Sequence, residues 1–439
     1  MDINNFNNTK VDTVVVGGGQ AGIAMSEHLS NLNISHLVLE KNRIAEAWRT
    51  RRWDSLVANG PAWHDKFPNM DFDEHQDTFV HHDKVAAYFE KYAKKINAPI
   101  HTGVEVISAR RNKSGPGFTV ETTKGNIQAT RIVAATGAFQ KAVIPSIAPK
   151  DSGLFQIHSE SYKNPGQLPE GAVLVIGTGA SGVQITDELN RAGKKVFLSV
   201  GSHERPPRRY RGRDNVWWMG VLGRWDIPEN STEKHKAFVV SGAHGGKNVD
   251  LRELASQGVT LLGRTKAFEN NKVIFQDDLA KNIHEGDAMY LGFLRDADLF
   301  LKHNDIDLPE EPEAYNILPD PECVTQPILE VDLEKENITT IIWASGFGQD
   351  YSWLKVDAFD SEGKPRQKLG ISNEIGVYFI GLPYLSARGS SFIWGVWHDA
   401  KRIAGHIKIQ RDYLTYEGSA ENTEIKAKQE AKEYCKTAS

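Results

Sequence analysis

The sequence predicts an α/β fold in which helices cover parallel β-strands. Two segments, TVVVGGGQAGIAMSEHL from Thr13 and VLVIGTGASGVQITDEL from Val173, repeat one pattern at an offset of 160 residues. Each has a run of aliphatic residues, a glycine-rich turn and then apolar residues at helical spacing. A second strand pattern follows both, ending at Glu40 and at Val200, so a strand–helix–strand unit occurs twice.

Further short strands are expected where an apolar run stops at a glycine, as in RIVAATG (131–137), TTIIWASG (339–346) and GVYFIG (376–381). A glycine at such a stop lets the backbone come close to a ligand. Proline and glycine cluster at 141–149, 163–171 and 318–326, which predicts loops, and we place crossings between domains at the first and third.

Length, charge and cysteine content limit the classes of protein to consider. A chain of 439 residues is long enough for two or three domains. Its net charge of -5 is small, and its Lys and Arg residues are scattered except at 205–213, so we expect no nucleic-acid partner. Residues 1–10 are polar and no run of about 18 apolar residues occurs, which predicts a cytoplasmic protein without a membrane partner. The two cysteines, Cys323 and Cys435, form neither a disulfide framework nor a C-x-x-C redox pair.

The first unit has the pattern of a dinucleotide-binding site. Its glycines fit G-x-G-x-x-G between a strand and a helix, so the unit is Rossmann-like. Such glycines allow the approach of a pyrophosphate, and the helix N-terminus offers free N–H groups to it. Glu40 ends the second strand, where a carboxylate accepts hydrogen bonds from a ribose. The predicted contacts are Gly17, Gly19, Gln20, Ala21, Gly22 and Glu40.

The second unit repeats the glycines but changes the position that selects the cofactor. No acidic residue stands at the ribose position after its second strand. A serine and three arginines follow instead, and these suit the 2′-phosphate of NADP(H). A solvated basic loop is the alternative, which Glu204 favours. The predicted contacts are Gly177, Thr178, Gly179, Ala180, Ser181, Gly182, Ser202, Arg205, Arg208 and Arg209.

Together with both glycine motifs, four further segments resemble the class B flavin monooxygenases, the group of flavin-containing monooxygenases and Baeyer–Villiger monooxygenases. These segments are AWRTRRWDSLVANGP (47–61), VAATGAF (133–139), WASGFGQD (343–350) and GSSFIWGVWHDA (389–400). The resemblance covers nearly the whole chain, from Val11 to about Gln410.

The resemblance implies FAD in the first unit, NADP(H) in the second, and the second unit inserted into the first. We therefore expect an FAD-binding domain at 1–165 and 331–415, an NADP-binding domain at 166–330 and a polar C-terminal helix or tail at 416–439. The 47–61 segment matches the family segment along the flavin, although its Trp and Arg residues also suit a surface patch. AATG and ASGF match the crossings between domains. The implied contacts are Trp48, Arg49, Trp53, Thr136, Gly137, Ser345 and Gly346.

Asn59 is the implied catalytic residue. SLVANGP resembles the S-L-x-x-N-x-P stretch of flavin-containing monooxygenases, in which the Asn lies beside the reactive flavin carbon. An amide there can donate hydrogen bonds without titrating. The alternative is an Asn that makes a turn before Gly60 and Pro61.

The family signature F-x-G-x-x-x-H between the domains is incomplete in this chain. His158 and Tyr162 match it, but Ser152 and Leu154 replace the Phe and the Gly. We expect His158 to be a hydrogen-bonding linker residue that orders domain movement rather than a catalytic base.

The implied activity is that of a monooxygenase. NADPH would reduce FAD, O2 would add to give a C4a-hydroperoxyflavin, and one oxygen atom would enter a small organic substrate. The alternatives are a flavoprotein NAD(P)H oxidoreductase or oxidase without oxygen insertion, and a nucleotide-binding redox sensor. A disulfide reductase is excluded because neither cysteine lies near a glycine motif. The fold does not decide the substrate, and a homodimer remains open.

Three other features complete the expectations. His64, His75, His81 and His82 show no metal-ligand spacing, so no metal is expected. With FAD in the first unit, a helix beginning near Ser391 would direct its N–H groups at the flavin; the alternative is a buried amphipathic helix. The aromatic stretch at 217–219 suits a substrate cavity or, as the alternative, an aromatic core.

Overall fold

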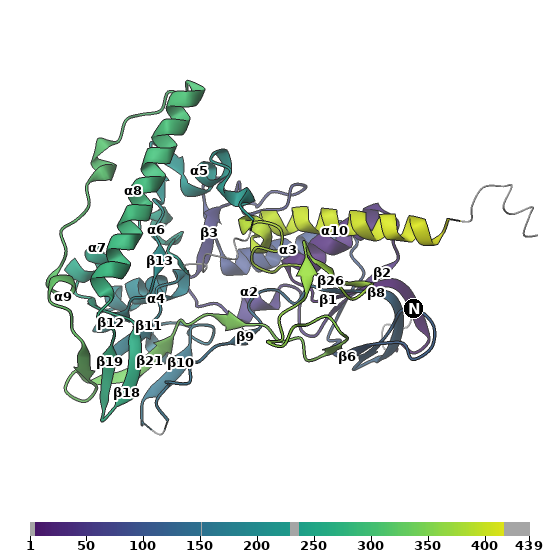
Figure 1. The fold of residues 1–439 in the computed structure, drawn as a ribbon, viewed down its shortest axis with the longest axis horizontal. Coiled ribbons are helices and arrows are strands. Elements are labelled where there is room, and N and C mark those ends of the chain that lie inside the picture. Colours follow the sequence, from purple (N-terminus) through teal and green to yellow (C-terminus); the bar gives the residue numbers. More distant parts are fainter. Residues whose placement is uncertain (1–4, 151, 229–236, 417–439) are drawn as a thin grey trace, which may run out of the picture.

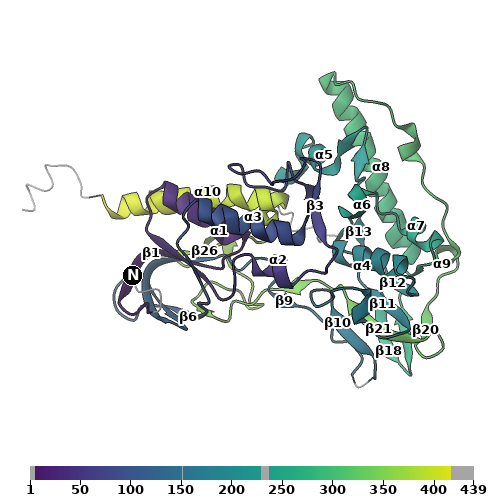
Figure 2. The same cartoon turned by 180° about the vertical axis from the view of Figure 1, so that it is seen from behind.

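The computed structural model describes residues 5–150, 152–228 and 237–416, which form two lobes (Figure 1). The chain begins in the first lobe, crosses to the second and returns, and its last described helix lies along the first lobe (Figure 2). The predicted tail at 417–439 lies outside the described residues. Within the described ranges, no helix is both long and apolar enough to span a membrane.

The strands are β1 (Thr9–Val16), β2 (His36–Glu40), β3 (Val57–Pro61), β4 (Phe79–His81), β5 (Ile100–Thr102), β6 (Val106–Arg111), β7 (Phe118–Thr122), β8 (Gly125–Ala134), β9 (Lys141–Ala142), β10 (Phe155–His158), β11 (Ala172–Ile176), β12 (Val196–Ser199), β13 (His203–Glu204), β14 (Arg209–Tyr210), β15 (Arg213–Asp214), β16 (Ala237–Phe238), β17 (Thr260–Leu262), β18 (Thr265–Glu269), β19 (Lys272–Phe275), β20 (Glu330–Asp332), β21 (Ile338–Trp343), β22 (Phe347–Gly348), β23 (Leu354–Lys355), β24 (Gln367–Lys368), β25 (Ile371–Ser372) and β26 (Val377–Phe379). The α-helices are α1 (Gln20–Asn31), α2 (Glu46–Thr50), α3 (His82–Lys95), α4 (Ala180–Arg191), α5 (Asn215–Val221), α6 (Ala243–Gly246), α7 (Leu251–Ser256), α8 (Leu279–Asn304), α9 (Glu322–Thr325) and α10 (Ile393–Leu414).

The first lobe is built on a ten-stranded sheet in which β8, β1, β2 and β5 are parallel neighbours. Val14 and Val15 of β1 and Val38 of β2 are fully buried, as expected of a parallel sheet covered on both faces. Helices α1, α3 and α10 contribute apolar residues to the same core. The predicted strand–helix–strand unit is therefore present, with α1 linking β1 to β2.

The second lobe repeats this unit on a five-stranded parallel sheet in the order β10-β21-β11-β12-β17. Helix α4 links β11 to β12, and Val173, Val175 and Val196 are fully buried. The expectation of an α/β fold with parallel strands is confirmed. The sheet also includes β10 and β21, so the second lobe extends beyond the predicted range 166–330 on both sides.

The chain crosses between the lobes along two short strands. β9 and β22 pair antiparallel, with Ala142 opposite Phe347, so the outgoing and returning segments lie side by side. The first crossing falls in the predicted stretch 141–149. We expected the second crossing at 318–326, and this was wrong. β20 and β21 follow that stretch and still pair with strands of the second lobe.

A helical extension rises from the second lobe, where α8 and α5 stand beside each other (Figure 1). Trp218 and Met219 of α5 are buried against residues of α8, including Phe293 and Leu294. For these two residues the structure favours the aromatic core over a substrate cavity.

Candidate functional site

The first glycine motif has two glycines required by the fold and one that faces open space. Gly17 has φ +115°, and a Cβ on it would lie 2.5 Å from the carbonyl oxygen of Ala135. A Cβ on Gly22 would lie 1.9 Å from the carbonyl oxygen of Gly17, so α1 packs directly on the turn. A Cβ on Gly19 would meet nothing within 4 Å. The open space at Gly19, at the start of α1, fits a pyrophosphate.

Glu40 lies beside this turn. Its carboxylate accepts hydrogen bonds from the main-chain N–H of Gly18 at 2.7 Å and of Asn42 at 2.8 Å. These bonds fix the carboxylate at the carboxyl end of β2, next to the glycine motif. The position fits the ribose contact that the sequence predicts.

Gln20, at the start of α1, connects the motif to two other segments. Its Nε2 donates to the carbonyl oxygen of Ser391 at 2.9 Å, just before α10 begins at Ile393. Its Oε1 accepts from Nε1 of Trp48 at 3.4 Å. The structure therefore brings Trp48 and the start of α10 to the first motif.

The other predicted residues of the 47–61 segment lie elsewhere. Arg49 forms an ion pair of 2.6 Å with Glu90 of α3. Trp53 is buried in the apolar core of the second lobe, together with Tyr162 and Val183. Trp53, which comes from a segment of the first lobe, thus packs into the second lobe and holds the two together.

The second glycine motif has the same backbone design. Gly177 has φ +116°, and a Cβ on it would lie 2.4 Å from the carbonyl oxygen of Ala344. A Cβ on Gly182 would lie 1.9 Å from the carbonyl oxygen of Gly177. The start of α4, with Gly179 as N-cap and then Ala180 and Ser181, has no side-chain cap and leaves its N–H groups to a phosphate.

The hydroxyl of Thr178 has a role within the turn. It accepts a hydrogen bond from the N–H of Gly201 at 3.0 Å, which ties the motif to the residues that follow β12. Ser202 comes next in the chain, before β13. The motif and the predicted 2′-phosphate region are therefore adjacent.

Two of the three predicted arginines are paired with carboxylates. Arg205 is buried and forms ion pairs of 2.9 Å with Asp250 and with Asp287. Arg208 is buried and forms an ion pair with Asp214. Arg209 is exposed, and among the described residues its guanidinium makes one long hydrogen bond of 3.5 Å, to the carbonyl oxygen of Gly246.

Arg264 is a candidate that the sequence did not indicate. A Cβ on Gly201 would lie 3.7 Å from its side chain and 3.9 Å from the hydroxyl of Thr178. Its guanidinium is half-exposed and is held by Asp278 at 2.6 Å. Arg264 follows β17, the neighbour of β12, so only knowledge of the sheet order could have found it.

Thr136, Gly137, Ser345 and Gly346 lie where the chain leaves one lobe for the other. The Cα of Thr136 would be 3.4 Å from a Cβ on Gly17, and Gly137 has φ +77°. The hydroxyl of Ser345 donates to the carbonyl oxygen of Val143 at 2.5 Å. All four thus sit between the two glycine motifs and the paired strands β9 and β22.

His158 stabilises this crossing. Its Nε2 lies 3.0 Å from the carbonyl oxygen of Gly346, and its ring packs edge-on against Phe347. Burial lowers the pKa of His158, which keeps the ring neutral and able to donate one N–H. The contacts fit a linker residue.

Asn59 of β3 is held from the second lobe. Its Oδ1 accepts from Nε2 of Gln184 at 2.9 Å, and its carbonyl oxygen accepts from Nη1 of Arg208 at 2.6 Å. Gln184 could not be identified from the sequence, because the contact joins residues 125 positions apart. The two contacts place the Asn59 amide where the lobes meet.

A small cavity opens beside Asn59. Nδ2 of Asn215 is buried there without a partner among the described residues, so it is available to a ligand. Asp65 accepts from the N–H of Gly60 at 3.0 Å and contacts Nδ1 of His64 at 2.8 Å. Both polar and apolar residues line the cavity; they are Asn59, Gly60, Asp65, Arg208, Asn215, Val216, Trp225, Phe238, Val240 and Phe392.

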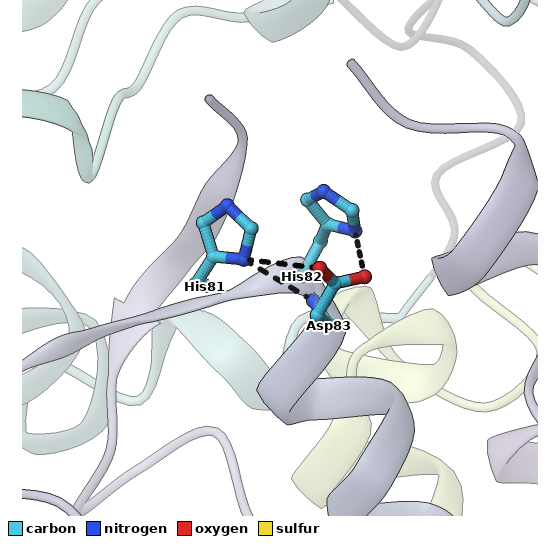
Figure 3. Close-up of side chains that lie close together, drawn as sticks. All are labelled: His81, His82 and Asp83. Carbon is cyan, nitrogen blue, oxygen red and sulfur yellow. Dashed lines mark hydrogen bonds and ion pairs between the residues drawn. The ribbon is translucent and has the colours of Figure 1, made fainter. Parts of the chain in front are cut away.

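His81, His82 and Asp83 gather at the start of α3, with possible ligand atoms within 4.8 Å of one another (Figure 3). Nε2 of His81 lies 2.8 Å from the carbonyl oxygen of Asp54, and Nδ1 of His82 lies 2.9 Å from that of Trp48. Burial lowers the pKa of His82, so its ring is neutral and gives its one N–H to Trp48. His81 also caps α3 by accepting from the N–H of Asp83. These bonds already engage Nε2 of His81 and Nδ1 of His82.

The chain is similar to known oxidoreductases. A model of the pyridine nucleotide-disulphide oxidoreductase family matches residues 14–213. An uncharacterized CzcO-like oxidoreductase of Geobacillus kaustophilus is 34% identical over 402 residues, covering 90% of this chain and 98% of that protein. The indole-3-pyruvate monooxygenase YUCCA1 of Oryza sativa subsp. japonica is 25% identical over 414 residues, covering 90% and 91%.

Solved structures show the same fold at lower identity. The flavin-containing monooxygenase from Stenotrophomonas maltophilia superposes with a TM-score of 0.65 at 19% identity, covering 92% of this chain and 99% of that one. A bacillithiol disulfide reductase from Bacillus cereus also matches, with a TM-score of 0.58 at 16% identity over 92% and 100% of the chains. The fold alone therefore does not separate oxygenases from disulfide reductases.

Proposed function

The chain belongs to the class B flavin-dependent monooxygenases, with a CzcO-like oxidoreductase among its relatives, and from this we propose that it inserts one oxygen atom of O2 into a small organic substrate at the expense of NADPH. It is an oxidoreductase that uses FAD and NADP(H); a structural neighbour, OTEMO, is described in complex with both (TM-score 0.51, 16% identity). Bound FAD would pass electrons from NADPH to O2 and carry the transferred oxygen as a C4a-hydroperoxyflavin.

We assign FAD to the first lobe. The N–H groups of Gln20, Ala21 and Gly22 would face the pyrophosphate above Gly19, and Glu40 would hold the ribose. Trp48 and the start of α10, both bonded to Gln20, would border the ring system. In this assignment the proposed FAD domain is 1–165 with 331–415, apart from β10 and β21, which pair in the second sheet.

We assign NADP(H) to the start of α4 in the second lobe. Arg205 and Arg208 are buried in ion pairs, whereas Arg209 is exposed and Arg264, although paired with Asp278, is half-exposed; Arg209 and Arg264 are therefore the better candidates to bind the 2′-phosphate. Guanidinium groups suit this phosphate because they form paired, charge-assisted hydrogen bonds with it.

Replacing Arg264 or Arg209 with Ala should raise the Kd for NADPH and leave that for NADH nearly unchanged. Loss of one charge-assisted hydrogen bond costs about 1.5–3 kcal/mol, or roughly ten- to a hundredfold in Kd. Titration of both nucleotides by the change in flavin absorbance measures this. Arg205→Ala is the contrasting variant, because it leaves Asp250 and Asp287 without their buried partner and should lower the melting temperature. Equal weakening of NADPH and NADH in both surface variants would remove these residues from the phosphate site.

The oxygen-insertion step is assigned to the cavity beside Asn59. The observation that carries this proposal is that an amide of the first lobe, fixed from the second, lines a largely apolar cavity built from residues of both lobes. Such a site can shield a reactive oxygen species from water while its N–H groups stabilise developing charge. The unpartnered amide of Asn215 offers a hydrogen bond to the substrate.

A screen for compounds that accelerate NADPH oxidation while lowering hydrogen peroxide release tests this function. With a true substrate, the oxygenated product should approach one per NADPH consumed. If every compound that accelerates NADPH oxidation leaves all of the reduced oxygen as hydrogen peroxide, the protein is an NADPH oxidase and the oxygenase proposal fails.

A further inference from the structure

The side-chain amide of Gln184 makes two hydrogen bonds that connect the lobes. Nε2 donates to Oδ1 of Asn59 at 2.9 Å and to the main-chain carbonyl oxygen of Val240 at 2.7 Å. Gln184 belongs to α4, the helix that begins at the second glycine motif, whereas Asn59 belongs to β3 of the first lobe. An amide NH2 group has two hydrogens, and these two contacts use both.

These contacts determine which way the Asn59 amide points. The carbonyl oxygen of Val240 can only accept, so Gln184 must present its NH2 group to it. The second hydrogen of the same NH2 group then faces Asn59, which must present Oδ1. The Nδ2 donors of Asn59 therefore point away from Gln184, and they have no protein partner among the described residues. They are available in the cavity that Asn59 lines.

The backbone of Asn59 is fixed from the second lobe as well. Arg208 donates to its carbonyl oxygen at 2.6 Å and is itself held by the ion pair with Asp214. Arg208 is buried, so this support is shielded from water. Both the position and the rotation of the Asn59 amide thus depend on residues of the second lobe.

We propose that Gln184 is a positioning residue, which turns the N–H groups of Asn59 into the reaction cavity and ties that orientation to the nucleotide-binding helix α4. The inference rests on the proposed role of Asn59. Gln184 lies two residues beyond Gly182, so a nucleotide bound at the start of α4 and the Asn59 amide are joined through one turn of helix. The donors are correctly placed only while the lobes hold this arrangement.

Gln184→Glu tests the proposal most sharply. A carboxylate has no N–H to give, so Asn59 should rotate its NH2 group towards α4 and withdraw it from the cavity. FAD content and the rate of flavin reduction by NADPH should stay within about twofold of wild type. Peroxide release per NADPH should rise as in Asn59→Ala, and the oxygenated flavin should decay at least about tenfold faster. Gln184→Met, which keeps the length but removes both hydrogen bonds, should give an intermediate effect.

A double-mutant cycle separates positioning from general damage to the fold. Because the proposed role places the Asn59 amide beside the flavin, Gln184→Glu and Asn59→Ala should each shift the absorption spectrum of bound, oxidised FAD. With Asn59→Ala already present, Gln184→Glu should change neither that spectrum nor peroxide release, because both changes act through one amide. The matched control is Asn190→Asp on the same helix, whose amide contacts the carbonyl oxygen of Gln257 at 3.2 Å and not Asn59; it should behave as wild type.

The outcomes distinguish this inference from the proposed function. Additive effects of the two changes, or a wild-type spectrum and peroxide yield in Gln184→Glu, would overturn the positioning role. If the wild-type protein forms no oxygenated flavin, the proposed function fails. The double-mutant cycle can still be measured from the absorption spectrum of bound, oxidised FAD, and it then decides whether Gln184 acts through Asn59.

Discussion

An Asn59→Ala variant should bind FAD and be reduced by NADPH as the wild type is, yet convert nearly all of the oxygen that it consumes into hydrogen peroxide. The amide lies where the lobes meet, and its hydrogen-bond partner is Gln184 rather than a glycine of either motif, so we expect nucleotide binding to be retained without it. Asn59 lines the cavity, and the donors that we infer to face it would stabilise charge on the flavin-bound oxygen.

The expected loss is about 10²–10³ in the rate of product formation, the usual cost of removing one preorganised donor. Asn59→Asp should do no better, because a carboxylate faces Gln184 equally well but repels the negative charge that it should stabilise. Asn126→Ala, a change of the same type at an exposed position of β8, serves as the control. Full coupling in Asn59→Ala would make this residue a turn-forming Asn before Gly60.

A Gly19→Val variant should fold normally and purify without flavin. A side chain at this position meets no protein atom within 4 Å, and the backbone torsions, φ -86° and ψ -167°, are extended and suit valine. The branched side chain would instead occupy the space proposed for the FAD pyrophosphate. We therefore expect FAD content below about a tenth of wild type, with an unchanged far-ultraviolet circular dichroism spectrum.

Gly405→Val is the matched control, because a Cβ on Gly405 also meets nothing within 4 Å but lies in α10, away from the glycine motifs. This variant should retain its flavin. Normal flavin content in a folded Gly19→Val protein would show that the first motif does not hold the cofactor. Gly22→Val cannot serve as this test in place of Gly19→Val, because a Cβ on Gly22 would lie 1.9 Å from the carbonyl oxygen of Gly17 and disturb the fold itself.

The sequence predicted the parts of the fold that rest on local pattern. β1, α1 and β2, and again β11, α4 and β12, follow from aliphatic runs and glycine turns that hardly depend on the rest of the chain. The boundary between the two lobes was harder to predict from the sequence. β21 joins the second sheet by pairing with β11, a contact between strands far apart in sequence, and no local signal marks it.

The residues of the candidate site also fall into two groups, those that a local pattern indicates and those that only the assembled fold brings together. The glycines and Glu40 could be assigned because their spacing itself encodes the turn. Arg205 and Arg208 were grouped with Arg209 as phosphate-binding residues, since their carboxylate partners could not be anticipated. Asp250 and Asp287, for example, reach Arg205 from distant segments. Gln184 and Arg264 were missed for the same reason: their contacts arise only when strands and lobes assemble.

We propose that this protein activates O2 on its flavin and protects the oxygenated flavin until its oxygen atom is transferred. Stopped-flow mixing of the NADPH-reduced, NADP⁺-bound protein with O2, in the absence of substrate, tests it most directly. We expect an oxygenated flavin that persists for many times the period of its formation and then decays slowly to oxidised flavin. Direct return to oxidised flavin with one hydrogen peroxide per flavin, and no intermediate species, would contradict it.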